Sequence, residues 1–215
     1  YVSGPVVRCA AKMGIHTALH EQNAFPGVTN KLLAPDVDIV FAAVPAAVEK
    51  LGAPDKTLVV GNPVRPEVFA QAANREAIRA QLGAGDRTVI LSFGGSLGAR
   101  ALNDTVPQAL ALIPAAQRPL VTHQSGAAQI DALRANYAAA GVEAELTPFI
   151  DDTASAFADA DVIVCRAGAS TVTEIAAVGA AAVFVPFPSA VDDHQTTNAQ
   201  FLVQAGGGWL LQQRD

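Results

Sequence analysis

The sequence has few cysteines, few charged residues and no long apolar run. Its two cysteines, Cys9 and Cys165, lie far apart without a neighbouring CxxC or HxxxH pattern, so neither a disulfide framework nor a zinc site is indicated. Charged residues make up 16% of the chain and the 14 basic ones form no cluster, which argues against nucleic acid as a partner. Every apolar run stops short of the roughly 20 residues that a membrane-spanning helix needs. The low cysteine content predicts a reducing, cytoplasmic setting.

Hydrophobic residues are abundant, at 51% of 215 residues, which excludes a disordered chain and indicates a packed globular protein. Short apolar runs alternate with Ala-rich stretches, a pattern typical of an α/β protein with βαβ units and a mostly parallel sheet. Predicted strands such as Val162–Cys165 and the run Val183–Val185 are apolar throughout rather than alternating, so we expect helices on both faces of the sheet. These strands are Asp38–Ala42, Thr57–Val60, Thr88–Phe93, Pro119–His123, Val162–Cys165 and Ala181–Val185. The predicted helices are Pro5–Lys12, Arg75–Leu82, Ala99–Ile113, Ala127–Ala139, Thr171–Ala177 and Asp193–Ala205.

A segment with two prolines and a glycine, Gly61–Pro66, directly follows a predicted strand and indicates a linker. We therefore place a domain boundary there, with residues 1–61 before it and residues 62–215 after it. The first part is shorter than the roughly 100 residues of a usual doubly wound domain, and the chain starts at Tyr1 without Met or a signal-like segment. We expect the chain to be a piece of a longer protein whose first domain is truncated here.

The strongest local signal is a glycine-rich turn between a predicted strand and a predicted helix. Gly94, Gly95 and Ser96 follow the strand that ends at Phe93 and precede the helix that starts at Ala99. Such a turn lets the backbone approach a phosphate closely, and the helix adds free N–H groups and the positive end of its dipole. The spacing fits neither the dinucleotide fingerprint nor the P-loop. The alternative to phosphate binding is a turn whose glycines serve packing alone.

A second strand-to-helix turn, within Cys165–Glu174, repeats this design with other side chains. Gly168 permits the turn, and Ser170 or Thr171 can cap the helix together with Glu174, as in a capping box. A carboxylate one turn into such a helix is also suited to accept both hydroxyls of a ribose. Two hypotheses for Glu174 stay open at this point, helix capping and ribose binding.

Other polar residues fall where an α/β fold forms its crevice. Arg65 can clamp a diphosphate through its planar guanidinium, or be a solvated loop residue. His194 and Gln195, in the first turn of the last predicted helix, are suited to sugar hydroxyls. His20 and Glu21 end a strand, where catalytic groups collect. Either can serve as a general base, and the alternative is a structural role.

Several motif-bearing segments occur in a fixed order along the chain. They are His20–Asn23, Gly61–Arg65, Gly94–Arg100, His123–Gly126, Phe149–Asp152, Cys165–Ala177, Val185–Phe187 and Asp193–Gln195. In this order they resemble the MurG family, the bacterial N-acetylglucosaminyltransferases of peptidoglycan synthesis. The resemblance runs over essentially the whole chain, which makes it far more specific than any single motif.

The resemblance implies a GT-B fold, in which two Rossmann-like domains with parallel sheets face each other across a cleft. The C-terminal domain then binds the donor nucleotide, and the N-terminal domain is truncated here. The resemblance places the donor diphosphate on Ser96 and Arg65. It places the uracil against the backbone of Ile150, next to Phe149.

The remaining donor contacts are also implied by the resemblance. Glu174 corresponds to the residue on the ribose hydroxyls, while Gln195 and Asn23 correspond to residues on the GlcNAc. Further nucleotide contacts are implied for Ala169, Ser170, Thr171, Val172 and Thr173, with Gly94, Gly95, Phe149, Arg166, Gly168 and His194 in supporting positions.

The implied reaction is an inverting transfer of GlcNAc from UDP-GlcNAc to the 4-hydroxyl of the MurNAc of lipid I. It proceeds by in-line displacement with UDP leaving and forms lipid II. No Asp-x-Asp metal motif occurs in the sequence, and we expect neither a metal nor another cofactor. The family's acceptor-side His, which would precede Tyr1, is a candidate general base beside Glu21 and His20. We expect this chain to bind donor without turning over by itself.

The resemblance also implies partners and a location. The partners are UDP-GlcNAc, lipid I, proteins of cell-wall synthesis and division, and the cytoplasmic face of the bacterial cell membrane, contacted peripherally by a segment before Tyr1. No nucleic acid is expected. Two alternatives stay open: another GT-B enzyme of UDP-sugars, such as a lipid glycosyltransferase or a UDP-GlcNAc epimerase, and a non-catalytic UDP-sugar-binding module.

Overall fold

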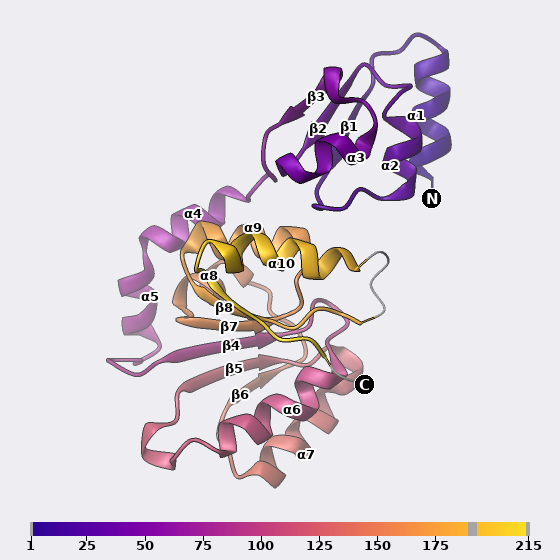
Figure 1. Ribbon diagram of the computed structural model, residues 1–215. Helices are drawn as coiled ribbons and strands as arrows, with labels where there is room; N and C mark the ends of the chain where they lie inside the picture. Colours follow the sequence, from indigo (N-terminus) through magenta and orange to yellow (C-terminus); the bar gives the residue numbers. More distant parts are fainter. Residues whose placement is uncertain (1, 189–192, 214–215) are drawn as a thin grey trace.

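The computed structural model describes residues 2–188 and 193–213, which form two parallel β-sheets joined by one connecting segment (Figure 1). The first sheet has three strands in the order β1-β2-β3 and carries helices α1 to α3. Its core is apolar and includes Leu33, Val40 and Leu51. Its elements are α1 (Ser3–Lys12), β1 (Ala18–Glu21), α2 (Val28–Leu33), β2 (Ile39–Ala42), α3 (Val48–Leu51) and β3 (Thr57–Val59), with short 3₁₀ turns at Pro45–Ala47 and Pro54–Lys56.

The second sheet has six parallel strands in the order β6-β5-β4-β7-β8-β9. Its strands are β4 (Val89–Phe93), β5 (Leu120–Gln124), β6 (Glu145–Thr147), β7 (Val162–Cys165), β8 (Ala181–Phe184) and β9 (Gly208–Leu210). Its helices are α4 (Pro66–Ala73), α5 (Arg75–Gln81), α6 (Arg100–Ala111), α7 (Ile130–Ala140), α8 (Thr153–Asp159), α9 (Ala169–Val178) and α10 (His194–Gln204), with 3₁₀ turns at Ala115–Gln117 and Ala127–Gln129.

The strand order of this sheet places a crevice beside β4. The chain runs outward from β4 through β5 to β6, and then returns to the other side of β4 with β7 before it continues to β9. Such a reversal is a topological switch point, and open α/β sheets bind ligands there, outside the carboxyl ends of the strands. The glycine-rich turn after β4 and the turn after β7 both lie at this edge.

Helices cover the two faces of the six-stranded sheet to different extents. On one face α8, α9 and α10 pack over β4, β7 and β8 through a core that includes Ile175 and Phe184. On the other face α6 and α7 pack over β4 and β5 around Leu133. The predicted two-sided cover is therefore confirmed for β4. Over β7 and β8 on the α6 side the cover is partial within the described residues. Val164 packs against the core of α6 and α7, but together with Val183 it also lines a hollow of about 620 Å³ whose other wall is α6.

The predicted strands all form, each within one residue of its predicted bounds. Sequence reasoning missed the three-residue edge strand β6 and the helices α2, α3, α4 and α8. Helix α4 starts at Pro66, where the missing N–H of proline costs nothing because the first helical N–H has no intrahelical partner. The connection between the sheets therefore ends at Arg65, and the predicted boundary between residues 61 and 62 falls within it.

Candidate functional site

The glycine-rich loop is held by direct backbone contact with a neighbouring turn. Gly95 and Gly98 have positive φ angles of 86° and 75°, a conformation that glycine adopts without strain. A Cβ atom at Gly98 would lie 1.7 Å from the carbonyl oxygen of Ser125, and one at Gly126 would lie 2.2 Å from that of Leu97. The loop therefore cannot carry side chains at its inner positions. Packing alone explains the glycines on the inner side of the loop, such as Gly98. The outer side, with Gly95 and Ser96, is exposed.

The outer side of this loop lines a hollow of about 450 Å³ at the carboxyl ends of β4, β7 and β8. The hollow brings Gly94, Gly95 and Ser96 together with Arg166, Phe187, Gln195 and Gln213. Helix α6 starts next to it at Arg100, so the positive end of a 12-residue helix faces the same space. The structure thus places the predicted phosphate loop and the predicted sugar contact Gln195 in one cavity.

Two side chains of this hollow also hold the surrounding turns. Arg166 donates to the carbonyl oxygens of Val185 and Pro186, at 2.9 Å each, and to Oε1 of Gln213 at 2.7 Å. Partial burial lowers the pKa of the Arg166 guanidinium from its ordinary value. Oε1 of Gln195 accepts hydrogen bonds from the backbone N–H groups of Ala167 and Phe187. Gln195 is thereby fixed against the turns after β7 and β8.

The capping hypothesis for the second turn is wrong. Helix α9 begins at Ala169 with Gly168 as its N-cap, and neither Ser170 nor Thr171 caps it with a side chain. Because no side chain among residues 2–188 and 193–213 accepts from the first N–H groups of α9, these groups can serve an anionic or polar ligand.

Glu174 forms an ion pair with the connection between the sheets. Its Oε1 accepts a 2.8 Å hydrogen bond from Nε of Arg65, and Nη2 of Arg65 donates to Oγ1 of Thr153 at 2.8 Å. The hydrogen bond to Glu174 raises the pKa of the Arg65 guanidinium. Sequence reasoning predicted both charged residues as ligand contacts but gave no sign that they pair with each other. Thr153 was not predicted at all.

Phe149 and Ile150 lie on the segment between β6 and α8, three to four residues before Thr153. The carbonyl of Phe149 accepts a 2.6 Å hydrogen bond from Oγ1 of Thr147, and the Phe149 ring is 54% exposed. Asp152 caps α8 by accepting from the N–H of Ser155, and its hydrogen bonds to Ser155 lower the pKa of the carboxyl group. Through Thr153, Arg65 therefore joins this segment to Glu174.

His20 and Glu21 have structural contacts in the first sheet. Nε2 of His20 lies 3.1 Å from the carbonyl oxygen of Gly61. The buried carboxylate of Glu21 accepts from the backbone N–H groups of Asn23 and Gly27 and from the side-chain amides of Asn23 and Asn30. Both of its oxygens are thereby used to shape the loop after β1. These contacts favour the structural role over general-base catalysis for Glu21.

The loop that Glu21 shapes touches the second sheet's helices. Oδ1 of Asn23 accepts from Nδ2 of Asn198 on α10 at 3.1 Å, and Oδ1 of Asn198 accepts from the N–H of Ala24. Nδ2 of Asn62 donates both to the carbonyl of Gln22 and to Oγ1 of Thr173. Sequence reasoning missed Asn198 and Asn62, because their role comes from contacts between the two sheets. Together they bring Asn23 to the side of α9 and α10.

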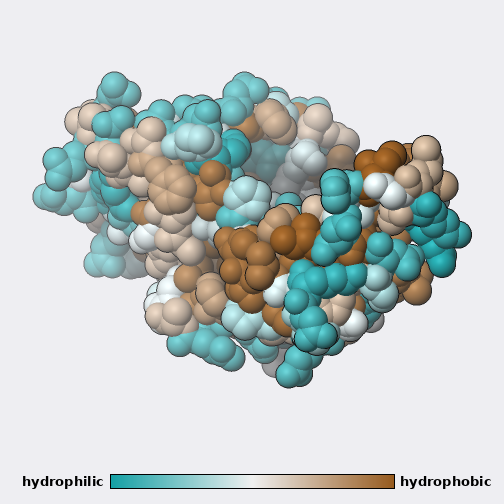
Figure 2. All heavy atoms as spheres, turned by 90° about the horizontal axis from the view of Figure 1, so that it is seen from above, coloured by the Kyte–Doolittle hydropathy of each residue, from teal (hydrophilic) through white to brown (hydrophobic). Residues whose placement is uncertain are grey.

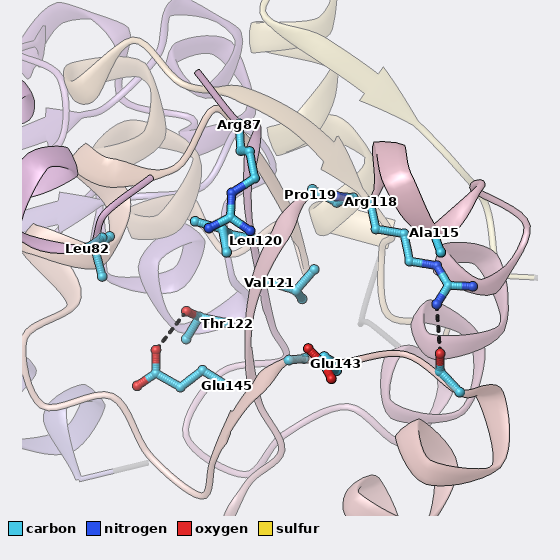
Figure 3. A pocket seen from close by; sticks show the side chains of 12 residues that line it. Leu82, Arg87, Ala115, Arg118, Pro119, Leu120, Val121, Thr122, Glu143 and Glu145 are labelled. Carbon is cyan, nitrogen blue, oxygen red and sulfur yellow. Dashed lines mark hydrogen bonds between the residues drawn. The ribbon is translucent and has the colours of Figure 1, made fainter. Parts of the chain in front are cut away.

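A separate hollow of about 590 Å³ lies at the opposite, amino ends of β4, β5 and β6 (Figure 3). It holds none of the predicted site residues. Arg118, which points along its wall, donates to the carbonyl oxygens of Ile113 and Gly141 at the ends of α6 and α7. Arg118 therefore stabilises the carboxyl-terminal ends of α6 and α7. In the described part of the chain no group of three His, Cys, Asp or Glu side chains is placed to hold a metal ion.

Comparison with known proteins gives consistent results. Residues 89–215 match the glycosyltransferase family 28 C-terminal domain. The chain is 66% identical over its whole length to a protein of Paracidovorax citrulli named UDP-N-acetylglucosamine–N-acetylmuramyl-(pentapeptide) pyrophosphoryl-undecaprenol N-acetylglucosamine transferase, of which it covers 58%. A protein of the same name from a Polaromonas species is 62% identical, again over the whole of this chain and 53% of that protein.

Solved structures show the same relationship. The crystal structure of MurG from Acinetobacter baumannii superposes with a TM-score of 0.77 at 42% identity, covering 99% of this chain and 58% of that one. UDP-GlcNAc 2-epimerase from Neisseria meningitidis superposes with a TM-score of 0.61 at 12% identity, over 94% of this chain and 64% of that one, which shows a shared fold alone. The chain thus has the GT-B arrangement of Rossmann-like parallel sheets, and it spans a little over half the length of the curated relatives that it matches.

Proposed function

Because the chain belongs to glycosyltransferase family 28 by its C-terminal domain, we propose that it is the donor-binding part of an N-acetylglucosaminyltransferase. The proposed reaction moves GlcNAc from UDP-GlcNAc to the 4-hydroxyl of the MurNAc of lipid I, with inversion, and gives lipid II. The names of the relatives support this donor and acceptor. The observation that carries the proposal is the hollow in which the glycine-rich loop meets Gln195 at the switch point of the sheet.

The diphosphate of the donor would lie on the glycine-rich loop. Ser96 is exposed on the outer side of that loop, and the start of α6 adds the positive end of its dipole. Negative charge grows on the departing UDP during in-line displacement, so groups that already point at this charge lower the barrier. Backbone N–H groups and Arg65 supply positive charge without a metal, and we propose that transfer needs none.

The nucleoside would bind between α9 and the segment before α8. Glu174 lies one turn into α9 and is mostly buried, at 14% side-chain exposure, so its carboxylate is well shielded for hydrogen bonds to ribose hydroxyls. In the structure Arg65 donates to Oε1 of Glu174. The ribose would therefore either bind this carboxylate together with Arg65 or displace the Arg65 guanidinium toward the diphosphate. The backbone of Ile150, beside Phe149, would take the uracil, with residues 169–173 as further contacts.

The GlcNAc would contact Gln195 and Asn23 from opposite sides, with His194 beside Gln195. Gln195 is fixed by two backbone hydrogen bonds, and Asn23 is held by Glu21 and Asn198. Side chains that are already held lose little freedom when they bind a sugar, which favours selectivity. Glu21 thereby contributes by positioning Asn23. His20 and a His on an acceptor-side segment are the remaining general-base candidates.

The proposal also concerns location and partners. The relatives' names contain undecaprenol, a long lipid, so their acceptor is anchored in a membrane. No helix among residues 2–188 and 193–213 is long and apolar enough to cross one. Apolar side chains gather in patches on the face seen in Figure 2. The exposed apolar side chains on α1 and α2 include Val6, Val28 and Leu32. We propose peripheral binding at the cytoplasmic face of the membrane, near the proteins of cell-wall synthesis and division.

Calorimetric titration with UDP-GlcNAc, UDP-glucose and NAD, followed by a transfer assay on lipid I with and without EDTA, tests the proposal. We expect saturable binding that prefers UDP-GlcNAc, and transfer by the intact protein that EDTA does not abolish. Preference for another UDP-sugar would point to a different GT-B enzyme. Binding without transfer by the intact protein would point to a UDP-sugar-binding module.

A further inference from the structure

A buried hydrogen-bonded cluster lies beneath the glycine-rich loop and contains none of the proposed donor contacts. Its members are Ser92 on β4, His123 on β5, Asn103 on α6 and Tyr137 on α7, all 3% exposed or less. Nδ1 of His123 lies 2.9 Å from the hydroxyl of Tyr137. Nε2 lies 3.1 Å from Oδ1 of Asn103 and 3.2 Å from Oγ of Ser92. Buried polar groups are costly unless all are paired, and here they pair into one continuous network.

The contacts of Asn103 determine which ring nitrogen of His123 carries the proton. Nδ2 of Asn103 donates to the carbonyl oxygen of Ser125 and to Oε1 of Gln129, at 3.1 Å each. Oδ1 is therefore the atom that faces the ring, and because an amide oxygen only accepts, Nε2 must be the protonated nitrogen. Nδ1 then accepts the O–H of Tyr137. Burial lowers the pKa of His123 to about 4, so the ring stays neutral at neutral pH.

The same network ends on the glycine-rich loop. Gln129, whose Oε1 accepts from Asn103, donates through Nε2 to the carbonyl oxygen of Leu97 at 3.1 Å. The carbonyl of Ser125, which also accepts from Asn103, is the atom that a Cβ at Gly98 would strike. Both supports of the loop thus depend on the orientation of the Asn103 amide. That orientation depends in turn on the N–H of the His123 ring.

We propose that His123 is a positioning residue for donor binding: through Asn103 and Gln129 it holds the loop Gly94–Gly98 in the shape that receives the donor diphosphate. The inference rests on the proposed function, because it takes this loop as the diphosphate site. His123 touches no substrate. A neutral imidazole suits the task because its rigid ring has one acceptor and one donor on different sides, which join a hydroxyl on α7 to an acceptor-only oxygen on α6.

Two matched substitutions distinguish the role of the Nδ1 side of the His123 ring from that of the Nε2 side. In His123→Asn the shorter amide reaches the place of Nδ1 and can still meet Tyr137, but no donor reaches Asn103. In His123→Gln the amide nitrogen reaches the place of Nε2 and restores that donor. In the intact protein we expect His123→Asn to raise the Kd for UDP about tenfold, the loss of about one hydrogen bond. We expect His123→Gln to stay within about threefold of the wild type.

Uridine is the control ligand, because it lacks the diphosphate. Its affinity should change less than about twofold in His123→Asn, since the effect acts on the phosphate loop. Gln129→Met removes the partly exposed end of the network and should weaken UDP binding in the same direction. Unchanged UDP binding in His123→Asn, or equal weakening of UDP and uridine, would overturn the proposal. A wild type that binds UDP without transferring GlcNAc contradicts the proposed function alone, whereas one that does not bind UDP contradicts both.

A measurement on the wild type keeps the test independent of how the variants fold. Nitrogen-15 NMR of the histidine rings reports which nitrogen carries the proton. We expect His123 to show a protonated Nε2 and an unprotonated Nδ1 throughout the neutral pH range. A protonated Nδ1, or a ring that titrates near the ordinary histidine pKa, would overturn the proposal.

Discussion

Replacement of Glu174 by alanine is expected to remove the protein's preference for a ribose over a deoxyribose in the donor nucleotide. In the proposed complex the Glu174 carboxylate accepts hydrogen bonds from ribose hydroxyls. The informative comparison is therefore between UDP and 2′-deoxy-UDP, which lacks one of those hydroxyls. The wild type should prefer UDP, and Glu174→Ala should bind the two nucleotides with nearly equal affinity.

The size of the effect follows from two opposing contributions. A hydrogen bond to a charged, mostly buried carboxylate contributes about 1.5–3 kcal/mol. The donor must compete with Arg65, which holds Oε1 of Glu174 at 2.8 Å and is 51% exposed. An exposed pair of this kind contributes only about 0.2–1 kcal/mol because water screens it. The net loss in Glu174→Ala is then about 1–2 kcal/mol, or roughly a 5- to 30-fold rise in the Kd for UDP.

Isothermal titration of both nucleotides into wild type and variant measures this loss directly. Glu67→Ala is the matched control, because Glu67 is another carboxylate whose charge acts on Arg65 but which lies exposed on α4. It should leave both affinities unchanged. If Glu174→Ala kept the wild-type ratio between UDP and 2′-deoxy-UDP, the ribose role of Glu174 would be refuted, even if both affinities fell.

Three further predictions concern the supporting structure. Gly98→Ala would place a Cβ atom 1.7 Å from a backbone oxygen, so it should lower the free energy of unfolding, measured by urea denaturation, by at least about 3 kcal/mol and abolish UDP binding. Gly95→Ala has open space around the new Cβ atom and should lower the free energy of unfolding by only about 1 kcal/mol. Asp161→Asn should cost about 2 kcal/mol by the same measurement, because this carboxylate accepts from Arg75, Arg79 and the N–H of Val89. The lowered pKa of His123, about 4 against 6.5 when unfolded, means that the unfolded state binds more protons between these values. The contribution of His123 to the free energy of unfolding should therefore be complete above pH 6.5 and fall by up to about 3 kcal/mol as the pH drops to about 4. Calorimetric melts at several pH values should show this pH dependence in the wild type and a weaker one in His123→Gln.

The fold was largely predictable because its central strands are rich in apolar residues, as expected for strands in the core of a sheet. Val162–Cys165 and Ala181–Phe184 show this most clearly. The missed strand β6, Glu145–Thr147, lies at the sheet edge, is three residues long and carries two polar side chains, so it has no such signal. Helix α8 did leave a signal: Asp152 precedes an Ala-rich run and caps the helix through the N–H of Ser155.

The candidate site was predictable in its parts and unpredictable in its pairings. The spacing of Ser170, Thr171 and Glu174 fits a capping box. The helix starts earlier, at Ala169, so these residues lie inside it and do not cap it. The partner that Glu174 has instead, Arg65, is 109 residues away in the sequence. Spacing rules apply within one helix or turn, so they cannot reveal a contact that only the folding of the whole sheet creates.

The two ends of the proposed donor site differ in the atoms that form them, and this determines which substitutions each end tolerates. The diphosphate end is made of backbone atoms packed on backbone atoms, where Gly98 and Gly126 tolerate no side chain. The ribose end is made of side chains from three elements, with Arg65 joining the connection between the sheets to Thr153 on α8 and to Glu174 on α9. A ligand that takes Glu174 from Arg65 therefore also loosens that connection. In the proposed complex, nucleotide binding would therefore act on the connection between the sheets through the Arg65 guanidinium, whereas the glycine-rich loop at the other end only has to stay rigid.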